Sequence, residues 1–169
     1  ALALDGHFGI EQTVCSEYGF FSYLNGTGFV MRRACILDAG NWSGETLVED
    51  LDLSFRAQLR GWKGLFLRDV SAPAEIPGFF AAFKSQQYRW SKGSIQVIRL
   101  LGWKLLTSRL PFLTLVQALF HLIGYTVQSM MLLLIILALP LYLWSNAWLV
   151  KLPLNSLGII GAGVPIFYI

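Results

Sequence analysis

One stretch of this chain contains no Asp, Glu, Lys or Arg, and it runs from just after Arg109 to just before Lys151. A helix that crosses the apolar layer of a membrane needs about 20 such residues, at about 1.5 Å of rise each. The stretch therefore predicts one full membrane span, whose core we place at residues 116–142. Pro140 falls near the far end of this span, where the loss of a backbone hydrogen bond is tolerated best.

The rest of the composition also indicates a membrane protein. Hydrophobic residues make up 55% of the chain and the mean hydropathy is +0.56, both above the values of ordinary soluble domains. A second apolar run begins near Leu152 and is still running at Ile169, too short to cross with its flanks. Trp144 and Trp148 would lie at the membrane interface. We expect one full span, one truncated span and a fragment cut at both ends.

The basic residues are distributed very unevenly. Every Lys and Arg except Lys151 lies before residue 110, so the positive-inside rule puts residues 1–109 on the cytoplasmic side of an integral membrane protein. The same rule puts the turn at residues 145–151 on the other side. The net charge of +3 is spread among acidic residues beside the span. Anionic lipid headgroups are therefore the expected partner, and no nucleic acid is expected.

Residues 1–77 mix short apolar stretches with glycine turns and predict a mixed α/β segment. Within it, "FVM" (29–31) and "GLFLRDV" (64–70) have the composition of strands. The sequence "ETLVEDLDLSFRAQLRGW" (45–62) predicts a helix, because apolar residues recur every four positions at Leu51, Phe55 and Leu59.

Both ends of this predicted helix carry recognisable signals. Thr46 followed by Glu49 forms a capping box, and Gly61 closes the helix. The acidic residues Glu49, Asp50 and Asp52 crowd its start, where the helix dipole favours negative charge. They stabilise a helix without any further function, so a purely structural interpretation stays open. A carboxylate in a cleft could instead act as a general base on a sugar hydroxyl.

Helical spacing returns over residues 78–109. Aromatic and aliphatic residues alternate there with lysines and arginines, a pattern typical of a helix that lies in the membrane surface. On such a helix Gln86, Arg89 and Trp90 share one face. Arg offers paired donors for a pyrophosphate, Gln a neutral donor, and Trp a flat surface for a pyranose ring. The alternative is a membrane-interface belt, in which Trp anchors and Arg snorkels.

The remaining polar residues give weaker signals. Asn25, Gly26 and Thr27 form a tight turn that a ligand could approach closely, although most such turns only reverse the chain. Cys15 and Cys35 are interpreted as reduced packing residues, and no metal site is predicted because the histidines lack ligand spacing. Within the predicted span a polar stripe recurs, which indicates either helix packing or the lining of a path for a polar product, at Gln117, His121, Gly124 and Gln128.

Taken in order, "LNGTGFVMRR", "LVEDLDLSFRAQLRGW" and "QQYRW", followed by apolar helices, resemble the inverting family 2 glycosyltransferases, specifically the cellulose-synthase-like and glucomannan-synthase-like membrane enzymes. The resemblance implies that Asp50 is the catalytic base of a Thr-Glu-Asp motif, in which this chain has Val48 in place of Thr. It also implies that Gln86 and Arg89 face the nucleotide diphosphate, that Trp90 stacks on the acceptor, and that residues 25–27 form the acceptor-side loop.

The resemblance implies a domain division as well. Residues 1–77 would be the carboxyl-terminal part of a GT-A catalytic domain, 78–109 an interfacial helical segment, and 110–169 the transmembrane region. The full-length protein is expected to use Mg²⁺ or Mn²⁺ through an Asp-x-Asp motif outside this chain, so the fragment alone is expected to be inactive.

The expected reaction transfers a sugar from a UDP-glucose or GDP-mannose type of donor to a growing β-linked glycan with inversion. The sequence leaves two alternatives open, a non-processive transferase acting on a lipid acceptor and a non-catalytic membrane docking module.

Overall fold

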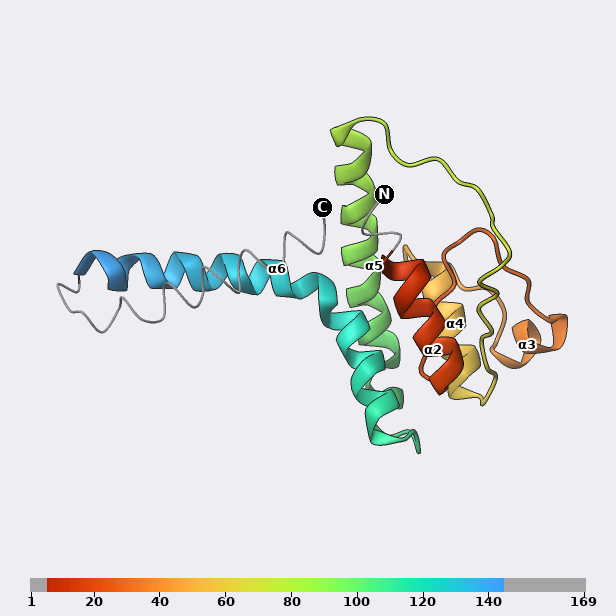
Figure 1. Cartoon of the computed structure of the whole chain (residues 1–169). Coiled ribbons are helices and arrows are strands. Elements are labelled where there is room, and N and C mark those ends of the chain that lie inside the picture. The colour runs from red at the N-terminus through yellow and green to blue at the C-terminus, as the bar shows by residue number, and fades with distance from the viewer. Residues whose placement is uncertain (1–5, 145–169) are drawn as a thin grey trace.

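The computed structural model describes residues 6–144, and within this range every regular element is helical (Figure 1). In chain order the elements are the π-helical turn η1 (His7–Gln12), α2 (Thr13–Tyr18), α3 (Arg33–Asp38), α4 (Glu49–Leu59), α5 (Phe80–Leu106) and α6 (Phe112–Trp144). Helix α5 is the central element, because it packs on both α4 and α6. A long extended segment leads from α4 back to the far end of α5 (Figure 1).

The main core forms where α4, α5 and α6 meet the extended segment after α2. Buried residues recur every four positions on α5 and α6, as expected for helices that bury one face. The buried members are Phe21, Tyr23, Val48, Leu51, Phe55, Val97, Leu101, Leu105, Ala118 and Leu122. A smaller cluster under α3 contains Cys35, Ala39, Leu53 and Ala57. Cys15 and Cys35 are buried and free, which confirms that both are packing residues.

Helix α4 confirms the predicted periodicity and its predicted end. Gly61 has a φ of 90°, and the N–H of Gly61 donates to Gln58 O at 3.0 Å. The N–H of Trp62 reaches back to Ala57 O at 3.2 Å, which completes a Schellman ending. The predicted capping box is wrong: α4 begins at Glu49, no side chain caps it, and the buried Thr46 hydroxyl has no hydrogen-bond partner among residues 6–144.

The two predicted strands do not form. Residues 29–31 and 64–70 lie in turns and extended chain, and no strand occurs between residues 6 and 144. A strand needs a neighbouring backbone to accept and donate its hydrogen bonds. Here a side chain does so instead, since the N–H of Phe66 donates to Ser16 Oγ at 3.0 Å. The described residues therefore do not confirm the α/β prediction.

Two glutamine side chains provide hydrogen-bond partners for the backbone of the extended segment after α2. Gln58 of α4 accepts from the N–H of Ser22 at 2.9 Å and donates to its carbonyl at 2.7 Å. Gln117 of α6 does the same for the preceding residue, accepting from Phe21 N at 3.1 Å and donating to Phe21 O at 3.2 Å. Each amide takes the place of one peptide group of an adjacent strand.

Replacing Gln58 by methionine should therefore destabilise the protein. The change keeps the length of the side chain but leaves the Ser22 N–H and C=O without their partner, at a cost of about 1–3 kcal/mol per buried group. Thermal unfolding of the purified full-length protein, followed by tryptophan fluorescence, measures this loss. Arg60→Met, an exposed position just after the same helix, is the control. Equal unfolding temperatures for the two variants would contradict the prediction.

Helix α6, which contains the predicted span at residues 116–142, is bent. Its arms, Phe112–Val127 and Ser129–Leu137, meet at 52°. No single helix among the described residues is long and apolar enough to cross a membrane, although the two arms together meet the length and composition test. The first arm packs beside α5 and buries Thr114, Ala118 and Leu122, and the second arm turns away (Figure 1). The predicted turn at 145–151 and the run from Leu152 lie outside the described residues.

Candidate active site

Asp50 is the second residue of α4 and is half-buried. Its Oδ1 accepts a hydrogen bond of 2.8 Å from the N–H of Leu51. Burial raises the pKa of the Asp50 carboxyl above its usual value; the bond from Leu51 opposes this shift and the charge of Glu49 adds to it. No cation lies within ion-pair distance of Asp50 in the described part of the chain. Its carboxylate is therefore desolvated, unpaired and suited to accept a proton.

The other acidic residues at the start of α4 differ from Asp50. Asp52 is buried and pairs with Arg56, whose Nη2 and Nε donate to Asp52 Oδ2 at 2.7 and 3.0 Å. Arg56 also donates to the backbone carbonyls of Ala39 and Asn41, so this pair ties α4 to the end of α3. Glu49 is exposed. A structural role is therefore visible for Asp52 in its pair with Arg56 and for Asp50 in its bond from Leu51, but Asp50 differs in having no ion-pair partner among the described residues.

The turn at residues 25–28 lies directly against the Asp50 carboxylate. Gly26 has a φ of 74°, and a Cβ at Gly26 would lie 3.3 Å from Asp50 Oδ2. The neighbouring Asn25 and Thr27 are exposed. The structure thus brings together two of the predicted site elements, the base and the acceptor-side loop.

The start of α4 also packs on α5 without any gap. A Cβ at Gly93 would lie 2.5 Å from Val48 Cγ2 and 2.6 Å from Val48 Cγ1. Three residues later on α5, the Gln96 side chain accepts from the N–H of Leu47 at 2.9 Å. The residue that replaces the family's Thr, Val48, is therefore a contact between the two helices.

Gln86, Arg89 and Trp90 occupy the α5 turns that precede this contact. They lie seven, four and three positions before Gly93, so they share its side of the helix. Trp90 is half-buried and packs against the main core, Gln86 is half-buried, and Arg89 is exposed. No hydrogen bond joins any of the three to Asp50 within the described residues. The structure places the motif and the carboxylate on adjoining elements.

A polar network beside this site could not be read from the sequence. His7 and Glu11 of η1 contact Tyr23, which stacks on His121 of α6 with ring centroids 3.4 Å apart. Gln117 also hydrogen bonds to the Tyr23 hydroxyl. The polar stripe on α6 therefore serves helix packing at Gln117 and His121. The sequence signals for this network were the four-residue spacings of His7 and Glu11 and of Gln117 and His121. Such spacings place two side chains on one face of a helix but do not show which segments of the chain contact each other.

The described residues do not fit a divalent metal site. No group of three or more His, Cys, Asp or Glu side chains there is arranged to hold an ion. Within the acidic cluster at the start of α4, Asp52 already forms an ion pair with Arg56.

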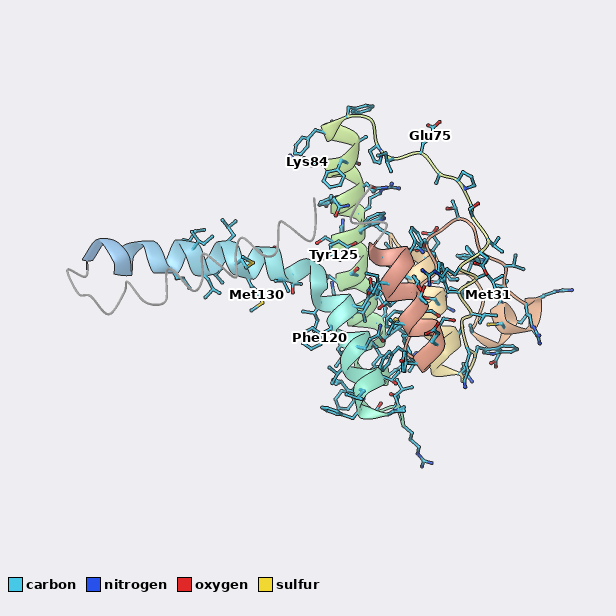
Figure 2. All side chains as sticks on the ribbon, viewed as in Figure 1. Met31, Glu75, Lys84, Phe120, Tyr125 and Met130 are labelled. Atoms are coloured by element: carbon cyan, nitrogen blue, oxygen red, sulfur yellow. The ribbon has the colours of Figure 1, made fainter. Side chains whose placement is uncertain are left out.

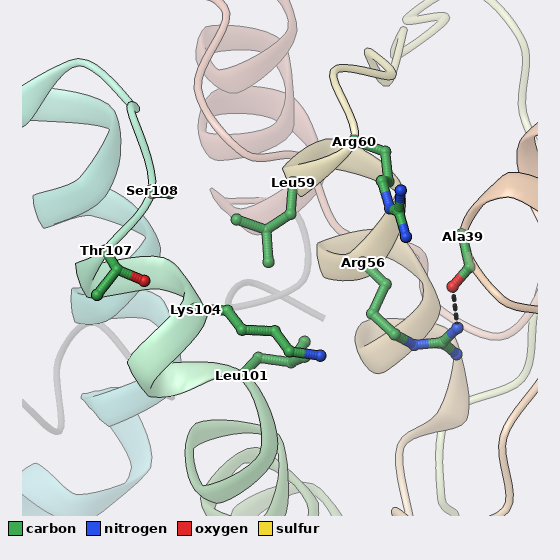
Figure 3. Close-up of a pocket in the computed structure, with 8 residues that line it drawn as sticks. All are labelled: Ala39, Arg56, Leu59, Arg60, Leu101, Lys104, Thr107 and Ser108. Carbon is green, nitrogen blue, oxygen red and sulfur yellow. Dashed lines mark hydrogen bonds between the residues drawn. The ribbon is translucent and has the colours of Figure 1, made fainter.

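A cavity of about 430 Å³ lies between the carboxyl-terminal ends of α4 and α5 (Figure 3). Arg56, Arg60 and Lys104 line it, and the guanidinium of Arg56 is directed to the carbonyl of Ala39 (Figure 3). Arg56 is already bonded to Asp52 and to two carbonyls, and the hydroxyls of Thr107 and Ser108 donate to the α5 backbone. Because most of its polar groups are satisfied internally, this cavity is not our candidate for the sugar site.

A family model described as glycosyl transferase family group 2 matches residues 4–147. The chain belongs to this glycosyltransferase family. Membership confirms the resemblance to the cellulose-synthase-like and glucomannan-synthase-like enzymes that the motifs indicated.

Several plant proteins are curated relatives of this family 2 glycosyltransferase. Glucomannan 4-beta-mannosyltransferase 2 of Arabidopsis thaliana is 47% identical over 98 residues, which cover 58% of this chain and 18% of that protein. Glucomannan 4-beta-mannosyltransferase 9 of Arabidopsis thaliana is 40% identical over 109 residues, or 64% of this chain and 20% of that protein. The chain spans about a fifth of the length of these relatives. No solved structure matches it.

Proposed function

We infer that this chain carries the acceptor side of the active site of a membrane-bound hexosyltransferase. The enzyme moves a sugar from a nucleotide sugar to a growing β-linked polysaccharide and inverts the anomeric centre. The observation that carries this proposal is the position of Asp50, without an ion-pair partner among the described residues, against the turn at Gly26 and at the start of a helix that contacts α5 at Gly93, three residues after the Gln-x-x-Arg-Trp motif. The relatives' names supply the product class, because glucomannan is a β-linked polymer of hexoses.

In the proposed mechanism Asp50 takes the proton from the attacking hydroxyl of the acceptor. The resulting oxygen forms a bond to the anomeric carbon of the donor while the bond from that carbon to the diphosphate oxygen breaks. Attack from the face opposite the leaving group inverts the configuration. The guanidinium of Arg89 meets the negative charge on the departing diphosphate, and Gln86 adds a neutral donor.

The remaining proposed site residues hold the acceptor. The indole of Trp90 provides an apolar surface on which the terminal pyranose ring stacks. The exposed turn at Asn25, Gly26 and Thr27 lets the acceptor come close to the Asp50 carboxylate, because Gly26 has no side chain. Glu49, which is exposed and precedes Asp50 in the chain, borders the path of the acceptor in this proposal.

We further propose that the site lies at a membrane surface on the cytoplasmic side. The first turns of α5 expose Phe79, Phe80 and Phe83, and Lys84 projects beside them (Figure 2). Met130 lies on the second arm of α6, which turns away from the rest of the molecule (Figure 2). In this proposal α5 is the interfacial segment, 78–109, and α6 enters the bilayer with its second arm, Ser129–Leu137, because its first arm packs on α5.

The donor and acceptor can be tested directly on the full-length protein in native membranes. GDP-mannose and UDP-glucose, each radiolabelled, are supplied separately, and the product is sized and digested with β-specific glycanases. We expect a polymer that resists extraction into organic solvent and yields β-linked oligosaccharides. The same samples, without and with added Mg²⁺ or Mn²⁺, test the cofactor proposal.

The other outcomes separate the alternatives. A labelled product that extracts into chloroform and methanol would indicate a non-processive transferase with a lipid acceptor. Absence of any transfer from either donor, by a folded and membrane-inserted protein, would favour a docking module. Either result would replace the proposal of polysaccharide synthesis.

A further inference from the structure

His7 connects the proposed acceptor loop to a chain of polar contacts. Its Nδ1 lies 2.8 Å from Glu11 Oε2, and its Nε2 lies 3.4 Å from Asn25 Oδ1. Gln12 approaches the same Nε2 at 3.4 Å and also donates to Tyr23 O at 2.9 Å. Because the Gln12 amide nitrogen only donates and Asn25 Oδ1 only accepts, His7 Nε2 forms a hydrogen bond with one of them at a time, while Nδ1 donates to Glu11 in either case.

The other end of this chain of contacts reaches α6. Glu11 Oε1 accepts from the Tyr23 hydroxyl at 3.1 Å and lies 3.6 Å from His121 Nδ1. Partial burial opposes ionisation of Glu11, but the contacts with His121 and His7 outweigh it and hold the pKa of the carboxyl below its usual range. Glu11 is therefore a fixed negative charge that joins α6 to the turn beside Asp50.

We propose that His7, oriented by Glu11, is a positioning residue that fixes the Asn25–Gly26 turn against the Asp50 carboxylate and couples that turn to α6. This inference rests on the proposed function, because it assigns the role through Asp50. The turn lies close to the carboxylate, since a Cβ at Gly26 would be 3.3 Å from Asp50 Oδ2. A displacement of the turn by about 1 Å is enough to slow a reaction about 100-fold.

The partial exposure of the pair indicates that it contributes little to folding stability. The side chain of Glu11 is 44% exposed and that of His7 is 21% exposed. Partly exposed ion pairs of this kind contribute little to folding stability. Removing the pair should therefore leave the protein folded while the turn loses its position.

The test is a double-mutant cycle in the full-length enzyme, with transfer from radiolabelled GDP-mannose and UDP-glucose as the assay. We expect His7→Leu to lower kcat about 10- to 100-fold with little change in the donor KM, and His7→Gln to retain most of the activity. In an Asn25→Ala background, His7→Leu should add almost nothing, because both changes free the same turn. Glu17→Gln, at an exposed position on α2 without a bonding partner in the described chain, is the control for Glu11→Gln and should be fully active.

Several results would overturn the inference. They are normal kcat in His7→Leu, additive effects of His7→Leu and Asn25→Ala, or equal activities of Glu11→Gln and Glu17→Gln. If His7→Leu does not fold, the cycle is run with Glu11→Gln in its place, and the same criteria apply. An inactive Asp50→Asn alongside a fully active His7→Leu rejects only the positioning role, whereas a fully active Asp50→Asn rejects the proposed function itself.

Discussion

Asp50→Asn is expected to lower the rate of sugar transfer by about 100- to 10,000-fold while leaving the protein folded. The substitution removes the group that accepts the proton, which is the contribution expected of a general base. It keeps an oxygen that can accept the 2.8 Å bond from the N–H of Leu51, so the start of α4 need not change. Transfer by the full-length protein, measured with saturating donor, gives the ratio of kcat values.

The stability of this variant follows from the direction of the pKa shift. Because burial raises the pKa of Asp50 in the folded state, ionising the carboxyl costs folding free energy. That cost is absent at pH values below the unfolded pKa and fully present above the folded pKa. Asparagine never ionises, so at neutral pH Asp50→Asn should unfold at the same temperature as the unmodified protein or higher.

The same shift predicts the pH dependence of the unmodified enzyme. The base works only when ionised, so kcat/KM should fall as the pH drops through the raised pKa of Asp50. This acid limb should therefore lie above the usual aspartate range near about 4. Glu45→Gln, in the exposed segment before α4, is the matched control and should keep both rate and pH profile. Normal transfer by a folded Asp50→Asn would rule out its role as the base.

Local sequence patterns were sufficient where the structure depends on near neighbours in the chain. The four-residue spacing of Leu51, Phe55 and Leu59 predicted α4, and Gly61 marked its end, because both signals act within a few residues. The capping-box prediction was wrong because of a contact with a residue outside the predicted helix. The N–H of Leu47 is taken by Gln96 of α5, and the helix starts later, at Glu49.

Sequence patterns were insufficient where the structure depends on contacts between segments that are far apart in the chain. Hydropathy alone could not show that Gln117 and His121 bind Phe21 and Tyr23, about a hundred residues earlier, and hold the first arm of α6 beside α5. Buried amides and imidazoles need partners, and here the partners are protein. The strands failed similarly, since the extended residues Phe21 and Ser22 are satisfied by glutamine side chains and not by a sheet. For the candidate site, the motifs named the residues, but the contact of Gly26 with Asp50 required the fold.

Gly93→Ala is the second change with a large expected effect, because it acts on the contact that joins α4 to α5. The new Cβ would lie 2.5 and 2.6 Å from the two methyl groups of Val48, closer than side chains tolerate. We expect a loss of about 1–3 kcal/mol of unfolding free energy, despite the better helix propensity of alanine. The start of α4 should shift with Val48, so transfer should also fall, by about 10- to 100-fold.

The same helix supplies the control. A Cβ at Gly102 would approach only Ile98 Cγ2, at 3.6 Å, so Gly102→Ala should be tolerated and should stabilise the protein by up to about 1 kcal/mol. Identical substitutions nine positions apart on α5 are thus expected to change the free energy of unfolding in opposite directions. Thermal unfolding and transfer by the full-length protein measure both, and equal behaviour would show that Val48 does not touch Gly93 closely.

A rescue experiment separates the clash from any other effect of Gly93→Ala. Val48→Ala removes both methyl groups that the new Cβ would meet and leaves only the Val48 Cβ position, 3.0 Å away. Alone, Val48→Ala should destabilise the protein, because it leaves a hole in the core. Combined with Gly93→Ala, which fills that hole, it should be more stable than the sum of the single changes and should regain transfer. Additive losses would mean that the two helices are joined in some other way, and that Asp50 does not depend on this contact for its place beside the motif.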